Sequence, residues 1–265
     1  MELSRIAQDL GIEYTGPQAE ITAVDYDSRK VGRGSLFCCL VGEKTDGHNF
    51  ASMAVEKGAS ALICQRPLPL NVPQLIVPDG REAMARAAAC FYGHPERELT
   101  MLAVTGTNGK TSVTYMVKSV AETAGKKVGL IGTIQNLIGE EKVYTERTTP
   151  ESVDLFALLQ RMADKGVDLV VMEVSSHALA QQRVAGIPFK AGLFTNLTQD
   201  HLDYHKTFEN YRSAKKKLFA QCGIAILNGD DETAAYMKEG LSIPVWTMGI
   251  HHPGEFYARG IEITT

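Results

Sequence analysis

The run AVTGTNGKTS, residues 103–112, limits the fold of this chain more than any other segment. Residues 100–104 are apolar and β-prone, which predicts a strand leading into the glycines. Residues 110–124 predict a helix whose apolar face would consist of Val113, Met116, Val117 and Val120. A strand that turns through glycines into a helix presents backbone N–H groups and the positive end of a helix dipole. Together these groups form a binding site for phosphate.

Each residue type in this run suits a nucleoside triphosphate. Gly106 and Gly109 let the backbone approach an anion, Lys110 can reach the terminal phosphates, and the Thr111 hydroxyl can bind Mg²⁺. The general phosphate-loop pattern has a glycine where this chain has Val104, so the run is a G-T-N-G-K-T variant. A G-K-T triplet alone is also compatible with an ordinary turn entering a helix. The flanking strand and helix favour a nucleotide site made of Gly106, Thr107, Asn108, Gly109, Lys110, Thr111 and Ser112.

The rest of the chain predicts an α/β protein with two domains. We expect a small N-terminal α/β domain over residues 1–97 and a central domain over 98–265, divided within the polar stretch 92–99. Strands are expected at 21–28, 35–42, 60–64 and 74–77 in the first domain, with a helix at 50–57 that Gly58 ends. Strands are expected at 101–105, 127–133, 168–174, 191–196 and 223–228 in the second, with helices at 151–165 and 208–220. Continuous apolar strands separated by helices predict a mostly parallel sheet covered on both faces.

The composition argues against several classes of protein. A net charge of −4 is not that of a nucleic-acid-binding surface. Apolar runs fall short of the ~20 residues of a membrane span, and the N-terminus lacks a signal-peptide core. We therefore expect a cytoplasmic protein without membrane insertion. The 5 cysteines have no CxxC spacing, so they are expected to be reduced and mostly buried, and a zinc site is not expected.

Glu173 ends the apolar strand expected over residues 168–174. Ligands of doubly wound sheets bind at the carboxyl ends of strands, so this carboxylate is placed to hold Mg²⁺ directly or through water. The alternative, a surface glutamate, is disfavoured by the apolar strand before it. The loop that follows the next strand contains Asp200, His201, Asp203 and His205. Because Mg²⁺ prefers oxygen ligands, His201 is from the residues alone equally a metal ligand or an exposed loop histidine.

Residues 206–219 predict an amphipathic helix with a cationic solvent-facing side. Its buried stripe would consist of Phe208, Tyr211, Ala214 and Leu218. Lys215 lies at the edge of this stripe. Partial burial would lower the pKa of Lys215 and make its amine available as a nucleophile, which alone identifies no function.

Two further motifs contain candidate binding residues. RTTPES, residues 147–152, predicts a helix with Pro150 at its first position, so Thr148 or Thr149 is either a helix cap or a binding hydroxyl. SSHALAQQR, residues 175–183, ends at Arg183, whose planar guanidinium suits a carboxylate or phosphate. The alternative for this second motif is a surface helix.

In this order, TGTNGKTS, TTPES, MEVSSHALAQQRV, FTNLTQDHLDYH and YRSAKKKLF resemble the Mur ligase family. DYDSR at 25–29 and GEKTDGHNF at 42–50 resemble the N-terminal domain of the member that adds the third residue of the peptidoglycan stem peptide. The resemblance spans essentially the whole chain. It implies an ATP-dependent amide ligase of cell-wall synthesis that uses ATP and Mg²⁺.

The resemblance also implies roles for individual residues. The catalytic residues would be Lys110, Glu173, His201 and Lys215. The metal ligands would be Thr111, Glu173, His201 and Lys215, the last as a carbamate derived from CO₂. The residues that match those holding the UDP-muramoyl dipeptide are Ser28, Thr148, Thr149, Ser175, Gln181 and Arg183. Arg147 departs from the family pattern, in which Asn often precedes TTP.

The implied reaction transfers the γ-phosphoryl group of ATP to the D-glutamate carboxylate of UDP-N-acetylmuramoyl-L-alanyl-D-glutamate. The amine of an amino acid, whether meso-diaminopimelate, lysine or another, then displaces phosphate and forms an amide. We expect a monomer that binds these substrates and no nucleic acid.

Two features of the C-terminal end point to a partial chain. Residues 256–265 alternate like a strand, yet the sequence ends within them. The family's C-terminal domain, which binds the incoming amino acid, has no counterpart here. We therefore expect an incomplete central domain and a chain that is inactive in ligation by itself.

Three alternatives remain open at this stage. The chain could belong to another Mur ligase, such as the one that adds D-Ala-D-Ala. It could also belong to a ligase similar to folylpolyglutamate synthetase, or be a non-catalytic module that binds a nucleotide or UDP-sugar.

Overall fold

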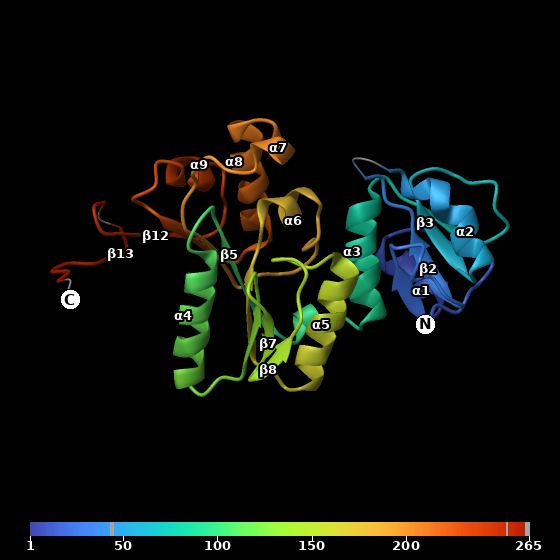
Figure 1. Cartoon of the computed structure of the whole chain (residues 1–265), viewed down its shortest axis with the longest axis horizontal. Helices are drawn as coiled ribbons and strands as arrows, with labels where there is room; N and C mark the ends of the chain where they lie inside the picture. The colour runs from blue at the N-terminus through green and yellow to red at the C-terminus, as the bar shows by residue number, and fades with distance from the viewer. Residues whose placement is uncertain (43–44, 253, 263–265) are drawn as a thin grey trace. The chain divides into compact units, whose positions relative to one another are not determined.

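The computed structural model describes residues 1–42, 45–252 and 254–262 (Figure 1). Its contacts divide the chain into two compact units. Unit 1 contains residues 1–95, 151–161 and 182–186, and unit 2 contains the remaining described residues. Residues 151–161 and 182–186 therefore belong to unit 1. The division expected from the sequence, into residues 1–97 and 98–265, does not include these two segments in the first domain.

Unit 1 is built on a four-stranded parallel sheet with the order β1-β2-β3-β4. Its strands are β1 (Ala23–Asp25), β2 (Ser35–Cys38), β3 (Ala61–Cys64) and β4 (Gln74–Ile76). Its helices are α1 (Leu3–Asp9), the 3-10 turn η1 (Gly47–Phe50), α2 (Ala51–Glu56) and α3 (Gly80–Phe91), and η2 (Pro95–Arg97) follows. The strands and α2 confirm the predicted α/β order, whereas α1 and α3 were not predicted. The run of alanines in α3 offers little apolar contrast, although Asp79 caps it through the N–H groups of Arg81 and Glu82.

Unit 2 is built on a nine-stranded sheet with the order β13-β12-β11-β10-β5-β9-β6-β7-β8. All neighbouring strands are parallel except β6–β7 and β7–β8. The strands are β5 (Thr100–Thr105), β6 (Val128–Ile131), β7 (Asn136–Ile138), β8 (Glu141–Val143), β9 (Leu169–Glu173), β10 (Ala191–Phe194), β11 (Ala225–Asn228), β12 (Val245–Gly249) and β13 (Phe256–Tyr257). The mostly parallel sheet confirms the predicted fold class. Residues 263–265 of the strand predicted at the end lie outside the described residues.

The helices of unit 2 lie against this sheet or follow the loops that leave its strands (Figure 1). They are α4 (Lys110–Thr123), α6 (Ser176–Ala180), α7 (Leu202–His205), α8 (Phe208–Lys216), η3 (Lys217–Gln221) and α9 (Ala234–Lys238). α5 (Ser152–Asp164) begins in unit 1 and ends in unit 2. α4 packs against β5, β6 and β9, and α6 packs against α8. None of the helices among the described residues is both long and apolar enough to span a membrane.

The predicted apolar face of α4 is partly wrong. Val113 and Val117 pack on the sheet core, together with Tyr115 and Ala121. Met116 and Val120, which were predicted to share that face, are 65% and 72% exposed. Apolar spacing predicted one stripe, but the sheet packs against a face of the helix rotated from it, which contains Tyr115 and Ala121 instead of Met116 and Val120.

Two smaller expectations are also wrong. Phe208 is 40% exposed, because it lies at the first position of α8 rather than inside the stripe that buries Tyr211, Ala214 and Leu218. α5 begins at Ser152, two residues after Pro150, so Pro150 does not hold the first helical position. The expected state of the cysteines is confirmed, since Cys38, Cys39, Cys64, Cys90 and Cys222 are all buried and none of them forms a disulfide in the described part of the chain.

Candidate functional site

The glycine loop lies at the carboxyl end of β5, which runs in the sheet between β9 and β10. Gly106 has a φ of +143° and Gly109 a φ of +82°, values that L-residues with a side chain rarely adopt. α4 begins directly after Gly109. The backbone N–H groups of its first turn have no acceptor one turn earlier and are therefore available to an anion. The strand, loop and helix predicted from the sequence are confirmed.

Two lysine side chains converge on this loop. The Nζ of Lys110 donates to the carbonyls of Gly106 and Thr107 at 2.9 and 2.8 Å. The Nζ of Lys215 donates to the same Gly106 carbonyl at 2.7 Å. Lys215 is only 1% exposed, so it is more deeply buried than its predicted place at the edge of a helix stripe implied.

The environment disfavours the charge on both lysines. Burial lowers the pKa of Lys110, while the carboxylates of Glu173 and Asp200 act in the opposite direction. Burial, and then the positive charge of Lys110, lower the pKa of Lys215 to about 7. The Lys215 ammonium also lies 4.7 Å from the centre of the Tyr211 ring. Near neutral pH, a substantial fraction of Lys215 is therefore the neutral amine.

Glu173 ends β9 and is only 1% exposed. Its carboxylate accepts hydrogen bonds from the Thr111 hydroxyl at 2.9 Å and from the Thr133 N–H and hydroxyl at 2.9 and 3.0 Å. A Cβ on Gly132 would lie 2.4 Å from its Oε1, so the residue before Thr133 must be glycine for this approach. Thr133 was not among the predicted site residues. Its place at the end of the strand predicted over 127–133 was the available signal.

The residues around Glu173 fit a magnesium ion by their donor chemistry. Mg²⁺ prefers octahedral oxygen ligands at about 2.1 Å, which places neighbouring ligand oxygens about 3 Å apart. The Thr111 hydroxyl and the Glu173 carboxylate oxygen are 2.9 Å apart in the structure. The donor chemistry and spacing of this pair, at the start of α4 and the end of β9, therefore fit such an ion.

His201 lies near the loop but in a more open position. It precedes α7 with a φ of +52°, and its Nε2 is 3.4 Å from Asp200. Its ring centre lies 6.2 Å from that of Tyr211, whose hydroxyl is 3.0 Å from the Thr107 hydroxyl. Its side chain is 48% exposed. The predicted role of His201 as a metal ligand stays a prediction.

His205 has a different environment from His201. It is buried, with its Nε2 2.9 Å from the Ser176 hydroxyl. Burial, followed by the neighbouring charges of His177, Lys215 and His201, lowers its pKa to about 4. His205 is therefore a neutral partner of Ser176 at neutral pH.

Four of the predicted substrate residues belong to unit 2. The Thr149 hydroxyl donates to the Glu173 carbonyl at 2.9 Å and accepts from the Ser175 N–H at 3.1 Å. Ser175 caps α6 through the Ala178 N–H. The Thr148 hydroxyl is 3.0 Å from that of Thr133, and Gln181 donates to Tyr204 at 3.2 Å. Thr148, Thr149 and Ser175 thus lie beside Glu173.

The other two predicted substrate residues belong to unit 1. Ser28 lies in the turn after β1, where its carbonyl accepts from Lys57 at 2.9 Å. Arg183 is 8% exposed and pairs with Glu151 at 2.9 Å. The surface-helix alternative for Arg183 is wrong, because its guanidinium is buried against a carboxylate. Residues 43 and 44 of the GEKTDGHNF motif lie outside the described residues.

Unit 1 also brings together side chains that were not predicted as a site. Asp9, Cys90 and His94 have ligand atoms within 4.8 Å of one another, the only such group of His, Cys, Asp or Glu found in the described residues. Asp9 and His94 are paired with each other at 3.1 Å. This contact brings two of the three side chains together.

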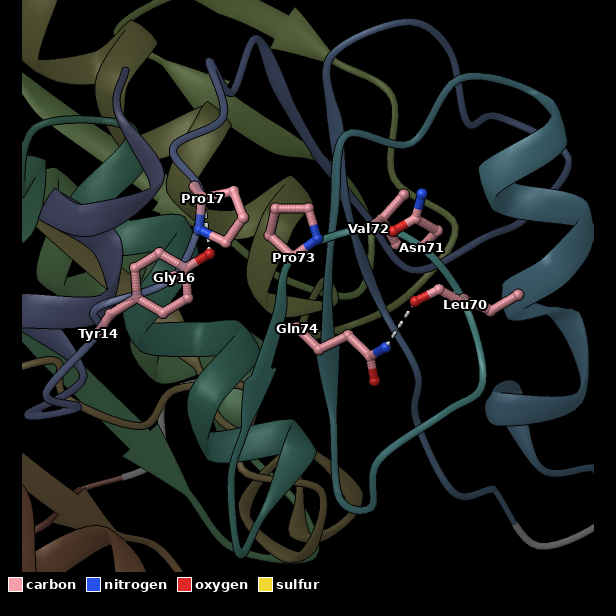
Figure 2. A pocket seen from close by; sticks show the side chains of 8 residues that line it. All are labelled: Tyr14, Gly16, Pro17, Leu70, Asn71, Val72, Pro73 and Gln74. Atoms are coloured by element: carbon pink, nitrogen blue, oxygen red, sulfur yellow. Dashed lines mark hydrogen bonds between the residues drawn. The ribbon is translucent and has the colours of Figure 1, made fainter.

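An open surface pocket of about 510 Å³ lies in unit 1 (Figure 2). Its lining consists of Tyr14, Gly16, Pro17, Leu70, Asn71, Val72, Pro73 and Gln74. Tyr14 and Gln74 direct their polar groups to the backbone carbonyls of Pro17, Leu68 and Leu70. No predicted site residue lines this pocket.

Comparison with known proteins agrees with this arrangement. The family model of the Mur ligase middle domain matches residues 104–265, and that of the Mur ligase family catalytic domain matches residues 20–92. The chain is 48% identical over 260 residues to the UDP-N-acetylmuramoyl-L-alanyl-D-glutamate–2,6-diaminopimelate ligase of Geobacillus thermodenitrificans, covering 95% of this chain and 53% of that protein. It is 45% identical over 270 residues to ligase 1 of the same name from Clostridium acetobutylicum, covering 100% and 56%. The chain thus spans about half the length of the curated relatives it matches.

Solved structures give the same result for the fold. A UDP-N-acetylmuramoyl-L-alanyl-D-glutamate–2,6-diaminopimelate ligase matches with a TM-score of 0.83 and 28% identity, over 95% of this chain and 54% of that one. The MurF ligase of Thermotoga maritima in complex with ADP matches with a TM-score of 0.54 and 18% identity, over 88% and 51%. The second likeness concerns the fold alone. Together with the family match over residues 104–265, these findings show that the chain belongs to the Mur ligase family.

Proposed function

We propose that this chain supplies the nucleotide site and the UDP-substrate residues of an ATP-dependent ligase. The ligase would add the third amino acid to UDP-N-acetylmuramoyl-L-alanyl-D-glutamate in the cytoplasm, as a monomer. The observation that carries the proposal is the glycine loop whose Thr111 hydroxyl contacts the buried carboxylate of Glu173. The names of its relatives make 2,6-diaminopimelate the proposed amine.

The structural comparisons favour this substrate class over the alternatives. The diaminopimelate ligase structure has a TM-score of 0.83 at 28% identity, whereas a MurF of Acinetobacter baumannii has 0.63 at 21%. A Mycobacterium tuberculosis folylpolyglutamate synthase matches over only 63% of this chain. Binding of the UDP-muramoyl dipeptide by this chain would distinguish the proposed function from both alternatives.

In the proposed reaction, the D-glutamate carboxylate attacks the γ-phosphorus of ATP, and ADP leaves. The amine then attacks the acyl phosphate, phosphate leaves with the bonding electron pair, and the amine loses a proton as the amide forms. The first-turn N–H groups of α4 and the Lys110 ammonium would hold and orient the phosphates. Thr111 and Glu173 would hold Mg²⁺, which when bound supplies positive charge that offsets the charge of the phosphates.

We propose that Lys215 acts as a carbamate. Its nearly complete burial and its pKa of about 7 supply the neutral amine that CO₂ requires. The nitrogen lone pair forms a bond to carbon, an electron pair of one C=O bond moves to its oxygen, and one proton leaves the nitrogen, so a neutral amine becomes an anionic oxygen donor. That donor, with His201, would hold a second Mg²⁺.

Six hydroxyl, amide and guanidinium groups are proposed to bind the UDP-muramoyl dipeptide. In unit 2 they are Thr148, Thr149, Ser175 and Gln181, and in unit 1 they are Ser28 and Arg183. Thr148, Thr149 and Ser175 lie within one hydrogen-bonded group beside Glu173 and Thr133. This proximity supports placing the substrate carboxylate near the phosphate loop.

The test measures ATP binding to the chain by calorimetry in the presence of Mg²⁺. Lys110→Ala is expected to weaken ATP binding about 100-fold, because a charge-assisted contact is worth about 1.5–3 kcal/mol. The matched control is Lys118→Ala, which removes a lysine of the same helix that pairs instead with Glu122. Equal ATP affinity in Lys110→Ala and in the unaltered chain would contradict the proposed site.

A further inference from the structure

The segment of residues 195–198, which follows β10, is bonded to the glycine loop at several points within unit 2. The side chain of Asn196 pairs with the peptide groups of Asn108. Its Oδ1 accepts from the Asn108 N–H at 2.9 Å, and its Nδ2 donates to the Asn108 carbonyl at 3.1 Å. The Thr195 hydroxyl donates to the same carbonyl at 2.6 Å. Both backbone groups of Asn108 are therefore held by side chains from a distant part of the sequence.

Thr107 is held by the same segment. Its N–H donates to the Asn196 carbonyl at 2.8 Å. Its hydroxyl accepts from the Thr198 N–H at 3.0 Å and donates to the Thr198 carbonyl at 3.2 Å. The N–H groups of Thr107 and Asn108 are thus already engaged, whereas the N–H groups of the first turn of a helix, here the turn after Gly109, have no acceptor within the helix itself.

Thr195 also fills the space beside Gly106. A Cβ on Gly106 would lie 1.9 Å from the Thr195 hydroxyl oxygen, and Thr195 is 7% exposed. This packing requires a glycine at position 106, beside the hydroxyl of Thr195. The backbone conformation of the loop therefore depends on Thr195 as well as on its own glycines.

We infer that Thr195 and Asn196 are positioning residues for phosphate binding. They fix Thr107 and Asn108 so that the N–H groups of residues 109–112 and the Lys110 ammonium face the terminal phosphates. A loop fixed in advance loses less conformational entropy when it binds, so its contacts yield more affinity. This inference rests on the proposed function of the loop in nucleotide binding. It also divides the loop into two parts. Residues 107 and 108 are held by Thr195 and Asn196, and residues 109–112 would bind the phosphates.

The test compares ADP with AMP, because the two nucleotides differ by the phosphate that the loop is proposed to hold. The variants are Thr195→Val, which keeps the shape and removes the hydroxyl, Asn196→Ala, and the conservative Thr195→Ser. The control is Thr114→Val, a buried threonine whose hydroxyl bonds to Thr111 within its own helix. Calorimetry gives the ratio of ADP to AMP affinity, and thermal unfolding shows which variants remain folded.

Thr195→Val is expected to lower the ADP-to-AMP affinity ratio about 10-fold, the effect of one lost hydrogen bond of about 1.4 kcal/mol, and Asn196→Ala, which removes two hydrogen bonds to Asn108, is expected to lower it by at least as much. Thr195→Ser and Thr114→Val are expected to keep the ratio of the unaltered chain. If Thr195→Val does not fold, Asn196→Ala and Thr195→Ser still test the inference. A purely structural role would lower both affinities together and leave the ratio unchanged.

Hydrogen exchange gives a second measurement that needs no nucleotide. The Asn108 N–H is expected to exchange about 10-fold faster in Asn196→Ala and to keep its rate in Thr114→Val. An unchanged ratio in folded variants, or an unchanged Asn108 exchange rate, would overturn the positioning role alone. Equal binding of ADP and AMP by the unaltered chain would overturn the proposed function of the loop and this inference with it.

Discussion

Three charged side chains of unit 2 lie at the glycine loop, and each of them has an identifiable partner. Glu173 is held by three donors from Thr111 and Thr133, so the cost of burying its carboxylate is offset by hydrogen bonds to a charged group. Lys110 and Lys215 instead share the Gly106 carbonyl. Two cations at one carbonyl are an unfavourable arrangement that an anion in the loop would relieve.

The lowered pKa of Lys215, caused by burial and by the charge of Lys110, leads to a prediction about stability and pH. The pKa of Lys215 is lowered to about 7 in the folded chain, so between pH 7 and its ordinary value the unfolded chain binds a proton that the folded chain does not. The free energy of unfolding should therefore rise with pH across this window, by about 2 kcal/mol between pH 7 and 9. Below pH 7 both states are protonated, and this contribution to the slope disappears.

Urea unfolding at several pH values in CO₂-free buffer measures this effect. Lys215→Met keeps the length of the side chain without its charge, so its stability should depend less on pH over the same window. Lys216→Met serves as the control for removal of a neighbouring charge. The same rise in Lys215→Met as in the unaltered chain would show that another group titrates.

At the scale of elements, only some of the apolar residues of α4 pack against the sheet. Val117 packs on the core formed with Val104, Val128 and Val171, whereas Val120 is 72% exposed. Val117→Ala is expected to lower the free energy of unfolding by about 1–2 kcal/mol, because it removes packed methyl groups. Val120→Ala, the same chemical change one turn away, should stay within about 0.5 kcal/mol of the unaltered chain.

Chemical denaturation of the two variants distinguishes two apolar faces of α4. The face seen in the structure contains Val117 but not Val120, and the face predicted from sequence spacing contains both. Similar losses of stability in both variants would indicate that Val120 is covered in solution. The comparison is internally controlled, because both substitutions have the same effect on helix propensity and differ only in burial.

The whole chain spans about half the length of the relatives it matches, at 53% and 56% of their lengths. The family resemblance places recognition of the incoming amino acid in a C-terminal domain. We therefore predict that the 265-residue chain binds ATP but releases no phosphate in response to diaminopimelate. A phosphate-release assay with ATP, Mg²⁺, the UDP-muramoyl dipeptide and the amino acid checks this, with ATP binding measured on the same sample. Phosphate release that depends on the amino acid would contradict the prediction.

Local sequence patterns were sufficient for much of the fold and part of the site. Glycines at positions 106 and 109 permit the positive φ angles of the loop, and the strand and helix around them are predicted by the apolar pattern of the sequence. Continuous apolar strands separated by helices gave the parallel sheet. Glu173 was found because a carboxylate at the end of an apolar strand has a predictable place at the edge of such a sheet.

Other features came only from the tertiary structure. Sequence spacing predicted a face of α4 that included Met116 and Val120, whereas the sheet packs against Val113 and Val117 and leaves those two residues exposed. The contact of Thr133 with Glu173 arises because β6 and β9 are neighbours in the sheet although α5 separates them in sequence. The hydrogen bonds from Thr195 and Asn196 to the glycine loop likewise form because β10 lies beside β5.

The sequence by itself thus determined that a strand turns through glycines into a helix at the glycine loop, because glycine positions and apolar periodicity act over a few neighbouring residues. The tertiary structure decided which side chains surround that loop. Strand order brings together residues that are far apart in the chain, and no local pattern records which strands become neighbours.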